Sequence, residues 1–380
     1  MKNSLLAFIF CYICATTFAQ GPALHIEKDT TKFTQWVERK IDSVMQKNDI
    51  PAVSVGIVYE GKVLLAKGFG VHQRGGLARA DENSIYQIAS DTKKMTGIMA
   101  QHLVLEGKLD LDLPIINFLG ETLQKAARER LKQITTRQLL QHTSGLPYRE
   151  LTMKRKDGEP MLVPYTEKDV MNDLNVVTLK AVPGENFGYS NFGYAVAGYL
   201  LEKVSGRSYS DLIREYIARP YDMPNTTTSL TAAQQQRLVT PYRKEDRTVA
   251  TKAFIMGKLS AAGGVYSNIK DLAQLMLLQL AAYRTYSADT PLNSLVLHTN
   301  PLERKNGYGF GLGKKVFATG TQFGHGGDMD GYASGYVFSP EHQAGVLLLT
   351  SSGGRWVGEL EKELFYKLTN RNYTPLKKSQ

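Results

Sequence analysis

The sequence predicts an α/β fold in which both chain ends build one domain and the middle forms an inserted, mostly helical domain. Residues typical of β-strands concentrate near the two ends of the 380-residue chain, and helical spacing dominates between them. One sheet must then join both ends, and any cleft lies between the two domains. The predicted boundaries are 1–19 for a signal peptide, 20–105 with 290–372 for the α/β domain, 106–289 for the helical domain and 373–380 for a polar tail.

The N-terminus has the features of a secretory signal peptide. Lys2 gives a positive start, the run Leu5–Cys14 is apolar, and Ala19 ends a stretch suited to cleavage before Gln20. The run is too short for a stable membrane anchor, and no later run of about 18 apolar residues follows. We therefore expect a periplasmic or secreted protein without a transmembrane segment after cleavage, with a buried N-terminal helix as the alternative.

Cysteine usage and charge exclude several kinds of chemistry. The chain has two cysteines, Cys11 and Cys14, and both fall inside the predicted signal peptide. A mature chain without cysteine excludes disulfides, thiolate metal sites and a cysteine nucleophile. The net charge is +10, but the basic residues are scattered, with one run of three at 154–156. Solubility explains this charge better than nucleic-acid binding, so we expect no nucleic-acid partner.

The N-terminal part of the α/β domain reads as a helix, a hairpin and a second helix. Apolar residues spaced by three and four predict an amphipathic helix over Thr31–Asn48. Two β-rich runs, Ala52–Tyr59 and Val63–Gly70, are separated by a short glycine-containing turn and predict a β-hairpin. The polar loop Gln73–Asn83 leads to a helix expected over Ser90–Leu105.

Helical spacing continues to about residue 280, after which β-rich runs return. The helices predicted in the middle are 136–141, 167–173, 194–204, 210–217 and 269–280. The later strands are predicted over Tyr308–Phe317, Tyr332–Ser339 and Ala344–Ser351, and a final helix over Gly358–Leu368.

Ser90 and Lys93 form the first candidate site. Residues three apart on a helix face the same way, so the Lys93 amine would lie beside the Ser90 hydroxyl. A lysine that loses its proton near neutral pH can activate a serine without a histidine. The unpaired N–H groups of the first helical turn would also favour negative charge developing at Ser90. A solvated helix face is the alternative, because serine and lysine are common on surfaces.

The second candidate stretch is the glycine-rich turn Pro183–Tyr194. It presents a phenol, Tyr189, and a carboxamide, Asn191, two residues apart on a loop. A phenol near a lysine can relay a proton to a leaving group, and an amide can hold a substrate carbonyl. The alternative is an ordinary aromatic-rich turn. The segment 188–193 has one residue too many for a Gly-x-Ser-x-Gly nucleophile elbow.

The third candidate stretch is Phe323–Tyr332, which contains His325, Gly326 and Gly327 ahead of a predicted strand. Glycines let a substrate lie against the backbone, so a strand edge can supply N–H donors to an oxyanion. A glycine-rich hairpin with one histidine is the structural alternative. His142 is the only other histidine in a suggestive loop, and none stands at ligand spacing, so we expect no metal.

In this order, the three stretches resemble the active-site motifs of the serine β-lactamase and penicillin-binding protein superfamily. The motifs are Ser90-x-x-Lys93, Tyr189-Ser190-Asn191 and His325-Gly326-Gly327. Ile134–Pro147 and Leu259–Ser267 with Asp271–Ala273 resemble further stretches of the class C β-lactamase branch. That branch also includes D-alanyl-D-alanine carboxypeptidases, D-aminopeptidases and carboxylesterases. The resemblance covers nearly the whole mature chain and implies an antiparallel sheet flanked by helices.

The resemblance implies a two-step acyl transfer without cofactor or metal. Ser90 would attack the substrate carbonyl, Lys93 would take its proton, and Tyr189 would protonate the leaving group and later activate water. The division of base duty between Lys93 and Tyr189 stays open, because the two would titrate as a coupled unit. Asn191 would orient the acyl side chain. The N–H groups of Ser90 and Asp328 would form the oxyanion hole, with the third motif against the substrate.

The charges around these motifs depart from the lactamase pattern. His325 and Gly326 stand where the family's lactamases usually carry a lysine followed by threonine or serine, while Asp328 and Asp330 add acidic groups. This exchange should weaken the binding free energy of a substrate carboxylate by on the order of 1–3 kcal/mol. Asp91, directly after Ser90, is a favourable acidic residue at a helix start if it turns outward.

We therefore expect an exported serine hydrolase that forms an acyl-enzyme at Ser90 and cleaves amide or ester bonds. The substrates would be small molecules or peptides, such as D-amino-acid peptides derived from peptidoglycan. A D-Ala-D-Ala peptidase and a carboxylesterase are close rivals, and efficient β-lactam hydrolysis is less favoured. A hypothesis from another class is an inactive protein that binds peptidoglycan fragments. Substrate choice would depend on loops around the cleft, including Lys154–Tyr165 and Arg284–Leu297.

Overall fold

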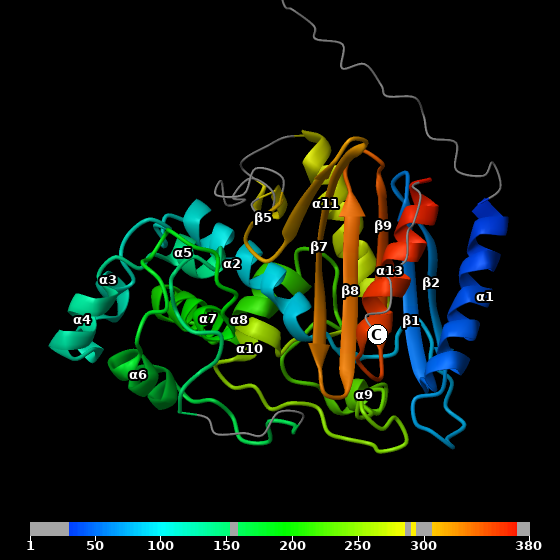
Figure 1. Cartoon of the computed structure of the whole chain (residues 1–380), viewed down its shortest axis with the longest axis horizontal. Helices are drawn as coiled ribbons and strands as arrows, with labels where there is room; N and C mark the ends of the chain where they lie inside the picture. Colours follow the sequence, from blue (N-terminus) through cyan, green and yellow to red (C-terminus); the bar gives the residue numbers. More distant parts are fainter. Residues whose placement is uncertain (1–29, 153–158, 286–289, 294–305, 371–380) are drawn as a thin grey trace, which may run out of the picture.

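The computed structural model describes residues 30–152, 159–285, 290–293 and 306–370. The predicted signal peptide and its cleavage after Ala19 lie outside these residues, as do the predicted tail 373–380 and parts of the two cleft loops. Within the described part, a large sheet with helices on both faces stands beside a group of helices (Figure 1). None of the helices in this part is long and apolar enough to cross a membrane.

The sheet has seven strands in the order β2-β1-β9-β8-β7-β6-β5, and all neighbours are antiparallel. In chain order the strands are β1 (Ala52–Tyr59), β2 (Lys62–Gly70), β5 (Asn306–Tyr308), β6 (Gly313–Phe317), β7 (Gly320–Met329), β8 (Tyr332–Ser339) and β9 (Ala344–Thr350). The N-terminal strand β1 pairs along its length with the C-terminal strand β9, from Val53 opposite Thr350 to Tyr59 opposite Ala344. The prediction that both chain ends build one sheet is therefore confirmed.

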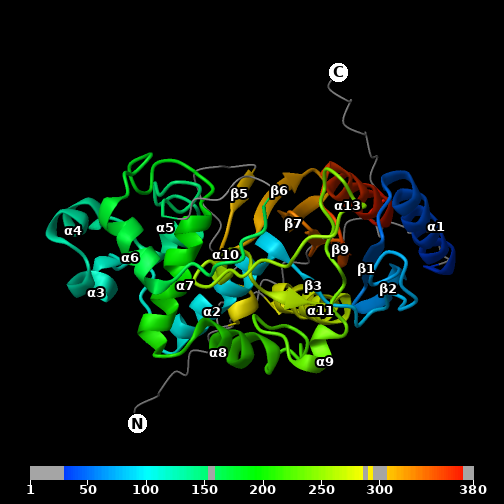
Figure 2. The same ribbon diagram turned by 90° about the horizontal axis from the view of Figure 1, so that it is seen from below.

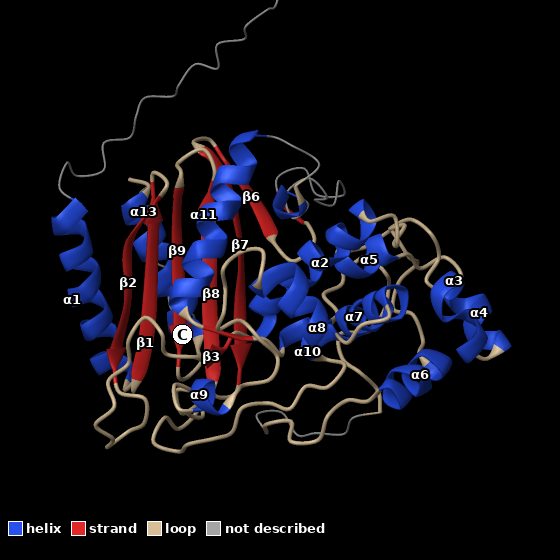
Figure 3. Ribbon diagram, turned by 180° about the vertical axis from the view of Figure 1, so that it is seen from behind, coloured by secondary structure: helices blue, strands red, loops and turns tan. Residues whose placement is uncertain are grey.

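Helices cover both faces of this sheet. On one face lie α1 (Thr30–Asn48) and α13 (Arg355–Leu368), whose apolar sides pack with β1 and β9 in one core cluster. On the other face lies α11 (Ile269–Thr285), which packs against β1, β2 and β9 (Figures 2 and 3). Because both faces are covered, β8 and β9 are buried at every residue and read as apolar runs rather than as alternating strands.

The second group of helices is centred on α7. This helix starts directly after the second motif, and residues 192–201 are all buried. The shorter helices are α3 (Ile116–Leu119), α4 (Lys125–Leu131), α5 (Thr136–Leu140), α6 (Glu167–Val176), α8 (Tyr209–Ile213), α9 (Ala232–Gln235) and α10 (Ser260–Gly263). Helix α7 (Asn191–Ser205) packs against most of them and against α2 (Lys93–Leu105), which leads away from the sheet. The division at 106–289 stays a prediction, although that range includes the sheet-covering helix α11.

Glycines account for two of the places where the observed strands differ from the expected ones; the short pair β3 (Tyr86–Gln87) and β4 (Tyr266–Ser267) was not expected either. The β-rich run Tyr308–Phe317 is two strands, because the chain turns back at Gly311, which has φ +100°. The stretch Phe323–Tyr332, expected ahead of a strand, lies mostly within strand β7 itself. A Cβ at Gly327 would come within 2.4 Å of the Ile88 carbonyl oxygen, so this glycine serves close packing of β7 against the segment that leads into the Ser90 turn.

Helix α2 depends on a glycine for its contact with the turn between β5 and β6. A Cβ at the buried Gly97 would lie 2.1 Å from the Phe310 carbonyl oxygen. We predict that Gly97→Ala lowers the free energy of unfolding by about 1–3 kcal/mol, since helix and turn must separate. Gly120→Ala is the matched control, because nothing lies within 4 Å of its Cβ position and its φ is −58°. Equal urea midpoints for both variants would contradict this packing.

Candidate active site

Ser90 and Lys93 meet where the sheet and the helical group adjoin. Ser90 lies in the 3₁₀ turn Ala89–Thr92, and Lys93 is the first residue of α2. The Nζ atom of Lys93 lies 3.2 Å from Ser90 Oγ, so the structure brings the predicted pair together. Ala89 precedes the serine with φ +51°, a left-handed conformation that is unusual for a residue with a Cβ. The turn thus holds Ser90 at some conformational cost.

The amine of Lys93 is fully buried and has three polar contacts. It lies 2.8 Å from Asn191 Oδ1 and 2.7 Å from the carbonyl oxygen of Ala262, in addition to Ser90. Burial lowers the pKa of Lys93 well below its usual value. A neutral amine has two N–H donors and one lone pair, which fit Asn191, Ala262 and the Ser90 hydroxyl respectively. The geometry therefore suits an amine that accepts the serine proton.

Tyr189 also lies close to the Lys93 amine. The Lys93 Nζ atom is 4.9 Å from the centre of the Tyr189 ring, and the phenol is hydrogen-bonded with Ser90. Burial raises the pKa of Tyr189 well above its usual value, and the hydrogen bond with Ser90 lowers it by less. Near neutral pH the phenol is therefore protonated. Of the two candidate bases, Lys93 has the environment that favours the basic form, and Tyr189 has the environment of a proton donor.

The start of α7 places Asn191 in contact with Lys93. Ser190 is the N-cap, and its Oγ accepts the N–H of Gly193 at 2.7 Å and donates to the Pro147 carbonyl at 2.6 Å. The N–H of Asn191 donates to the Tyr148 carbonyl at 2.9 Å. The serine within the second motif is thus a capping residue that fixes the helix start, and it leaves the neighbouring side chains to face Lys93.

The third motif lies on β7 beside the Ser90 turn. Pairing of β7 with β6 runs from Gly320 to Gly324, so from His325 to Met329 this strand is paired on the β8 side only, as far as the described residues show. Alternate N–H groups of an antiparallel strand point away from its partner. Asp328, whose N–H is predicted to form part of the oxyanion hole, lies along this edge. On the same strand, Gly327 packs against Ile88 and Ala89.

His325 carries no fixed positive charge. Burial lowers the pKa of its imidazole to about 3, so it is neutral near pH 7. Its ring centre lies 6.1 Å from that of Tyr189 and 5.7 Å from that of Tyr308. A neutral imidazole leaves this position of the third motif without a cation. No cluster of three or more histidine, cysteine, aspartate or glutamate residues that could hold a metal ion occurs in the described ranges.

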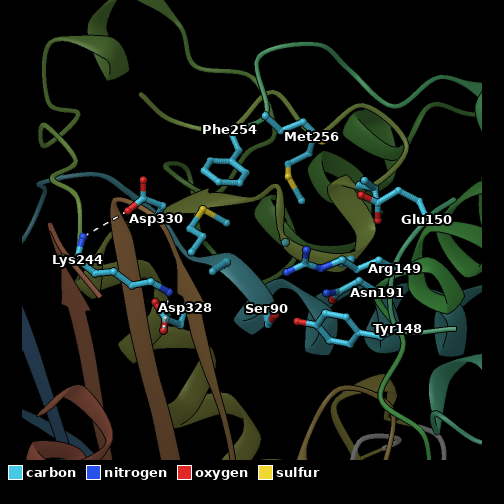
Figure 4. Close-up of a pocket in the computed structure, with 16 residues that line it drawn as sticks. Ser90, Tyr148, Arg149, Glu150, Asn191, Lys244, Phe254, Met256, Asp328 and Asp330 are labelled. Carbon is cyan, nitrogen blue, oxygen red and sulfur yellow. Dashed lines mark hydrogen bonds and ion pairs between the residues drawn. The ribbon is translucent and has the colours of Figure 1, made fainter. Parts of the chain in front are cut away.

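A cavity of about 340 Å³ opens next to Ser90. Its lining includes Ser90, Asn191 and Asp328, whereas Lys93, Tyr189 and His325 lie outside the lining. The apolar side chains are Met161, Phe254, Met256, Leu259 and Met329, and the charged ones are Arg149, Glu150, Lys244, Asp328 and Asp330. Figure 4 shows Lys244, Asp328 and Asp330 on one side of Ser90, with Arg149 and Glu150 on the other.

The sequence predicted the two acidic residues near the site but not the basic residue beside them. Lys244 Nζ lies 3.9 Å from Asp328 Oδ2, and the Lys244 N–H donates to Asp330 Oδ1 at 3.3 Å. Lys244 therefore offsets part of the negative charge. It lies in an irregular segment far from the motifs in sequence, so no local pattern indicated it.

The outward orientation considered for Asp91 is wrong. Its side chain is fully buried and forms an ion pair with Lys94, which is also fully buried. The Lys94 amine lies 3.7 Å from the centre of the Tyr336 ring, on strand β8. The first turn of this helix packs against the sheet, so an acidic residue there has no water to face. Burial raises the pKa of Asp91 and lowers that of Lys94, while each partner opposes these shifts.

Known proteins resemble this chain over most of its length. The Beta-lactamase family profile matches residues 37–368. The chain belongs to the Beta-lactamase family.

Two relatives are similar to this chain in sequence, and one solved structure is similar to it in fold. Protein flp of Staphylococcus aureus (strain MW2) is 25% identical over 356 residues, covering 90% of this chain and 68% of flp. D-alanyl-D-alanine-carboxypeptidase/endopeptidase AmpH of Escherichia coli (strain K12) is 27% identical, covering 74% of this chain and 70% of AmpH. A class C β-lactamase structure superposes with a TM-score of 0.78 at 18% identity, covering 93% and 99% of the two chains, and this shows the shared fold. Family membership supports a serine-hydrolase type of activity.

Contact between β7 and the Ser90 turn requires the absence of a side chain at Gly327. A Cβ there would lie 2.4 Å from the Ile88 oxygen and 2.8 Å from the Ala89 Cβ. We predict that Gly327→Ala lowers the free energy of unfolding by about 1–3 kcal/mol, because β7 must move away from the turn. Gly326→Ala is the neighbouring control, since its Cβ would meet only the Ser334 oxygen at 3.5 Å. Thermal unfolding of both variants tests this, and a larger loss for Gly326→Ala would contradict it.

Proposed function

We propose that this protein is an exported serine hydrolase that forms an acyl-enzyme at Ser90 and hydrolyses amide or ester bonds. The observation that carries the proposal is the buried Lys93 amine, held 3.2 Å from Ser90 Oγ by Asn191 and the Ala262 carbonyl. A serine needs such a base to act as a nucleophile. Export rests on the signal-peptide features of residues 1–19.

The proposed acylation step transfers one proton from Ser90 to Lys93 and another from Tyr189 to the leaving group. Ser90 Oγ attacks the substrate carbonyl carbon as neutral Lys93 takes the hydroxyl proton. The backbone N–H groups of Ser90 and Asp328 stabilise the oxyanion. Collapse of the intermediate breaks the bond to the leaving group, which takes a proton from Tyr189, and the proton on Lys93 then restores the phenol. Water repeats the sequence on the acyl-enzyme and releases the acid.

The charge distribution favours substrates without a carboxylate next to the scissile bond. His325 is neutral, and Gly326 has no hydroxyl, so the third motif lacks the groups that would hold a substrate carboxylate. Esters and internal or blocked amides are therefore better substrates than β-lactams in this proposal. Peptidoglycan-derived D-amino-acid peptides cleaved at an internal bond are compatible with it, and the endopeptidase activity in the name of AmpH supports such a substrate.

Carboxylesterase and β-lactamase activities use the same residues and are the alternatives within this fold. The alternative from another class is an inactive protein that binds peptidoglycan fragments. The contacts of Lys93 with Ser90 and Asn191 favour activity, because a binding protein has no need of a desolvated amine beside a serine hydroxyl.

Covalent labelling tests the nucleophile. We predict that a fluorescent fluorophosphonate labels residues 20–380 and that Ser90→Ala abolishes the label. Ser229→Ala is the control, because Ser229 is exposed and does not line the cavity beside Ser90, so this variant should label like wild type. A fluorescent penicillin should label more slowly, since its carboxylate meets no cation at His325. The proposal would be contradicted if wild type and Ser90→Ala were labelled equally and hydrolysed nitrophenyl esters at equal rates.

The pH dependence tests the base. Burial lowers the pKa of Lys93, and the neutral amine exists only above that lowered pKa. We predict that kcat/KM rises with pH through a single pKa well below the usual lysine value of about 10.4 and then levels off.

His325→Gln should keep this rising limb, because a histidine with a pKa of about 3 is already neutral throughout the range measured. A limb that disappears in His325→Gln would assign the base to the histidine instead. Rates that fall as pH rises from 5 to 8 would exclude a neutral lysine base altogether.

A further inference from the structure

His142 lies against Tyr189 and is fully buried. Its ring centre is 4.3 Å from that of Tyr189, with further ring contacts to Phe187, Tyr194 and Tyr308 at 4.7–5.8 Å. None of the three motifs includes this residue, and the cavity beside Ser90 does not reach it. A histidine in this position could be an ordinary core residue, so its hydrogen bonds decide what it does.

Those hydrogen bonds hold the residues on both sides of Tyr189. The N–H of Gly188 donates to the His142 carbonyl at 2.7 Å, and the N–H of Ser190 donates to His142 Nδ1 at 3.0 Å. A third bond, from the Gly184 N–H to the Thr143 carbonyl at 2.7 Å, fixes the start of the same loop. One residue therefore binds the backbone before and after Tyr189 and also packs on its ring.

The bond to Ser190 determines the protonation of the imidazole. Nδ1 can accept an N–H only when it carries no proton, so the ring is neutral with its hydrogen on Nε2. Burial holds the pKa of His142 well below its usual value, which agrees with this state. Nε2 is buried and has no hydrogen-bond partner in the described part of the chain. The backbone of His142 has φ +59°, which fits a residue held in place by its surroundings.

We propose that His142 is a positioning residue that aims the Tyr189 hydroxyl at the leaving group. The inference rests on the proposed function, in which Tyr189 supplies the leaving-group proton. The carbonyl and Nδ1 of His142 fix the loop, and the imidazole face fixes the phenol ring. His142 itself does not contact the substrate in this proposal. Loss of its side chain therefore slows the reaction only where proton donation by Tyr189 limits the rate.

Two substitutions separate the contributions of the ring and the acceptor. His142→Phe keeps an aromatic ring but leaves the Ser190 N–H without a partner. His142→Asn loses the ring but places Oδ1 close to the position of Nδ1, where it can accept the same N–H. His102→Asn is the control, because His102, in helix α2, stacks on Tyr216 at 4.8 Å and contacts none of the motifs.

Substrates with different leaving groups give the decisive readout. An ethyl ester needs a proton on its leaving oxygen, whereas a p-nitrophenyl ester loses a stable phenolate without one. We predict that His142→Phe lowers kcat/KM, which reports only the steps up to release of the alcohol, by roughly 10-fold to 100-fold on the ethyl ester and by about 3-fold or less on the p-nitrophenyl ester. His142→Asn should recover part of the lost rate, and His102→Asn should affect both esters equally.

The same substitution in a Tyr189→Phe background tests whether His142 acts through Tyr189. We expect the additional loss on the ethyl ester to fall to about 2-fold or less, because the donor is already absent. Equal losses on both esters, or an undiminished loss in Tyr189→Phe, would overturn the inference. Failure of the proposed function would look different: wild type and Ser90→Ala would then hydrolyse both esters at the same rate.

A measurement on the unaltered protein guards against variants that do not fold. In ¹⁵N NMR spectra of the histidine rings, His142 should show a bare Nδ1 and a protonated Nε2 that persist from pH 8 to pH 5. A proton on Nδ1 in this range would break the bond to Ser190 and contradict the proposed positioning.

Discussion

The burial of one amine, that of Lys93, is the constraint on which the rest of the structure depends. Its three contacts come from different elements: Ser90 from the turn before α2, Asn191 from the start of α7 and Ala262 from α10. A buried charged amine would be costly, so the site favours the neutral form, and the neutral form is the one that can accept a proton from serine. The fold therefore activates Ser90 by excluding water from its neighbour, and no histidine base is needed.

Close backbone approach connects this amine to the sheet. Gly97 lets α2 lie against the turn at Phe310, and Gly327 lets β7 lie against the turn that carries Ser90. The capping serine of α7 and the bonds from His142 then fix the second motif on the opposite side. The nucleophile, the base and the phenol are thus held by packing of rigid elements, which is how a site keeps its geometry before substrate binds.

The sequence predicted what depends on local pattern or on motif spacing. The hairpin β1–β2 and the helices α1 and α11 follow from periodicity. The meeting of Ser90 with Lys93 follows from their spacing of three residues, although Ser90 lies in a 3₁₀ turn just before α2 and not, as predicted, in the helix itself. The extent of strand β7 was not predicted, because the glycines of the third motif are typical of a turn. The burial of Asp91 was not predicted, because no sequence pattern shows that the turn before α2 packs against the sheet. Lys244, Ala262 and the role of His142 depend on contacts between distant segments, which a single sequence does not encode locally.

The activation of Ser90 requires above all that Lys93 is a neutral amine in the folded protein near pH 7. The most direct measurement is a ¹³Cε NMR titration of lysine-labelled protein, with the Lys93 resonance assigned by its loss in Lys93→Met. We expect this resonance to titrate far below those of the exposed lysines and to have the neutral shift already at pH 7–8. A Lys93 resonance that stays in the charged form up to pH 10 would contradict this expectation.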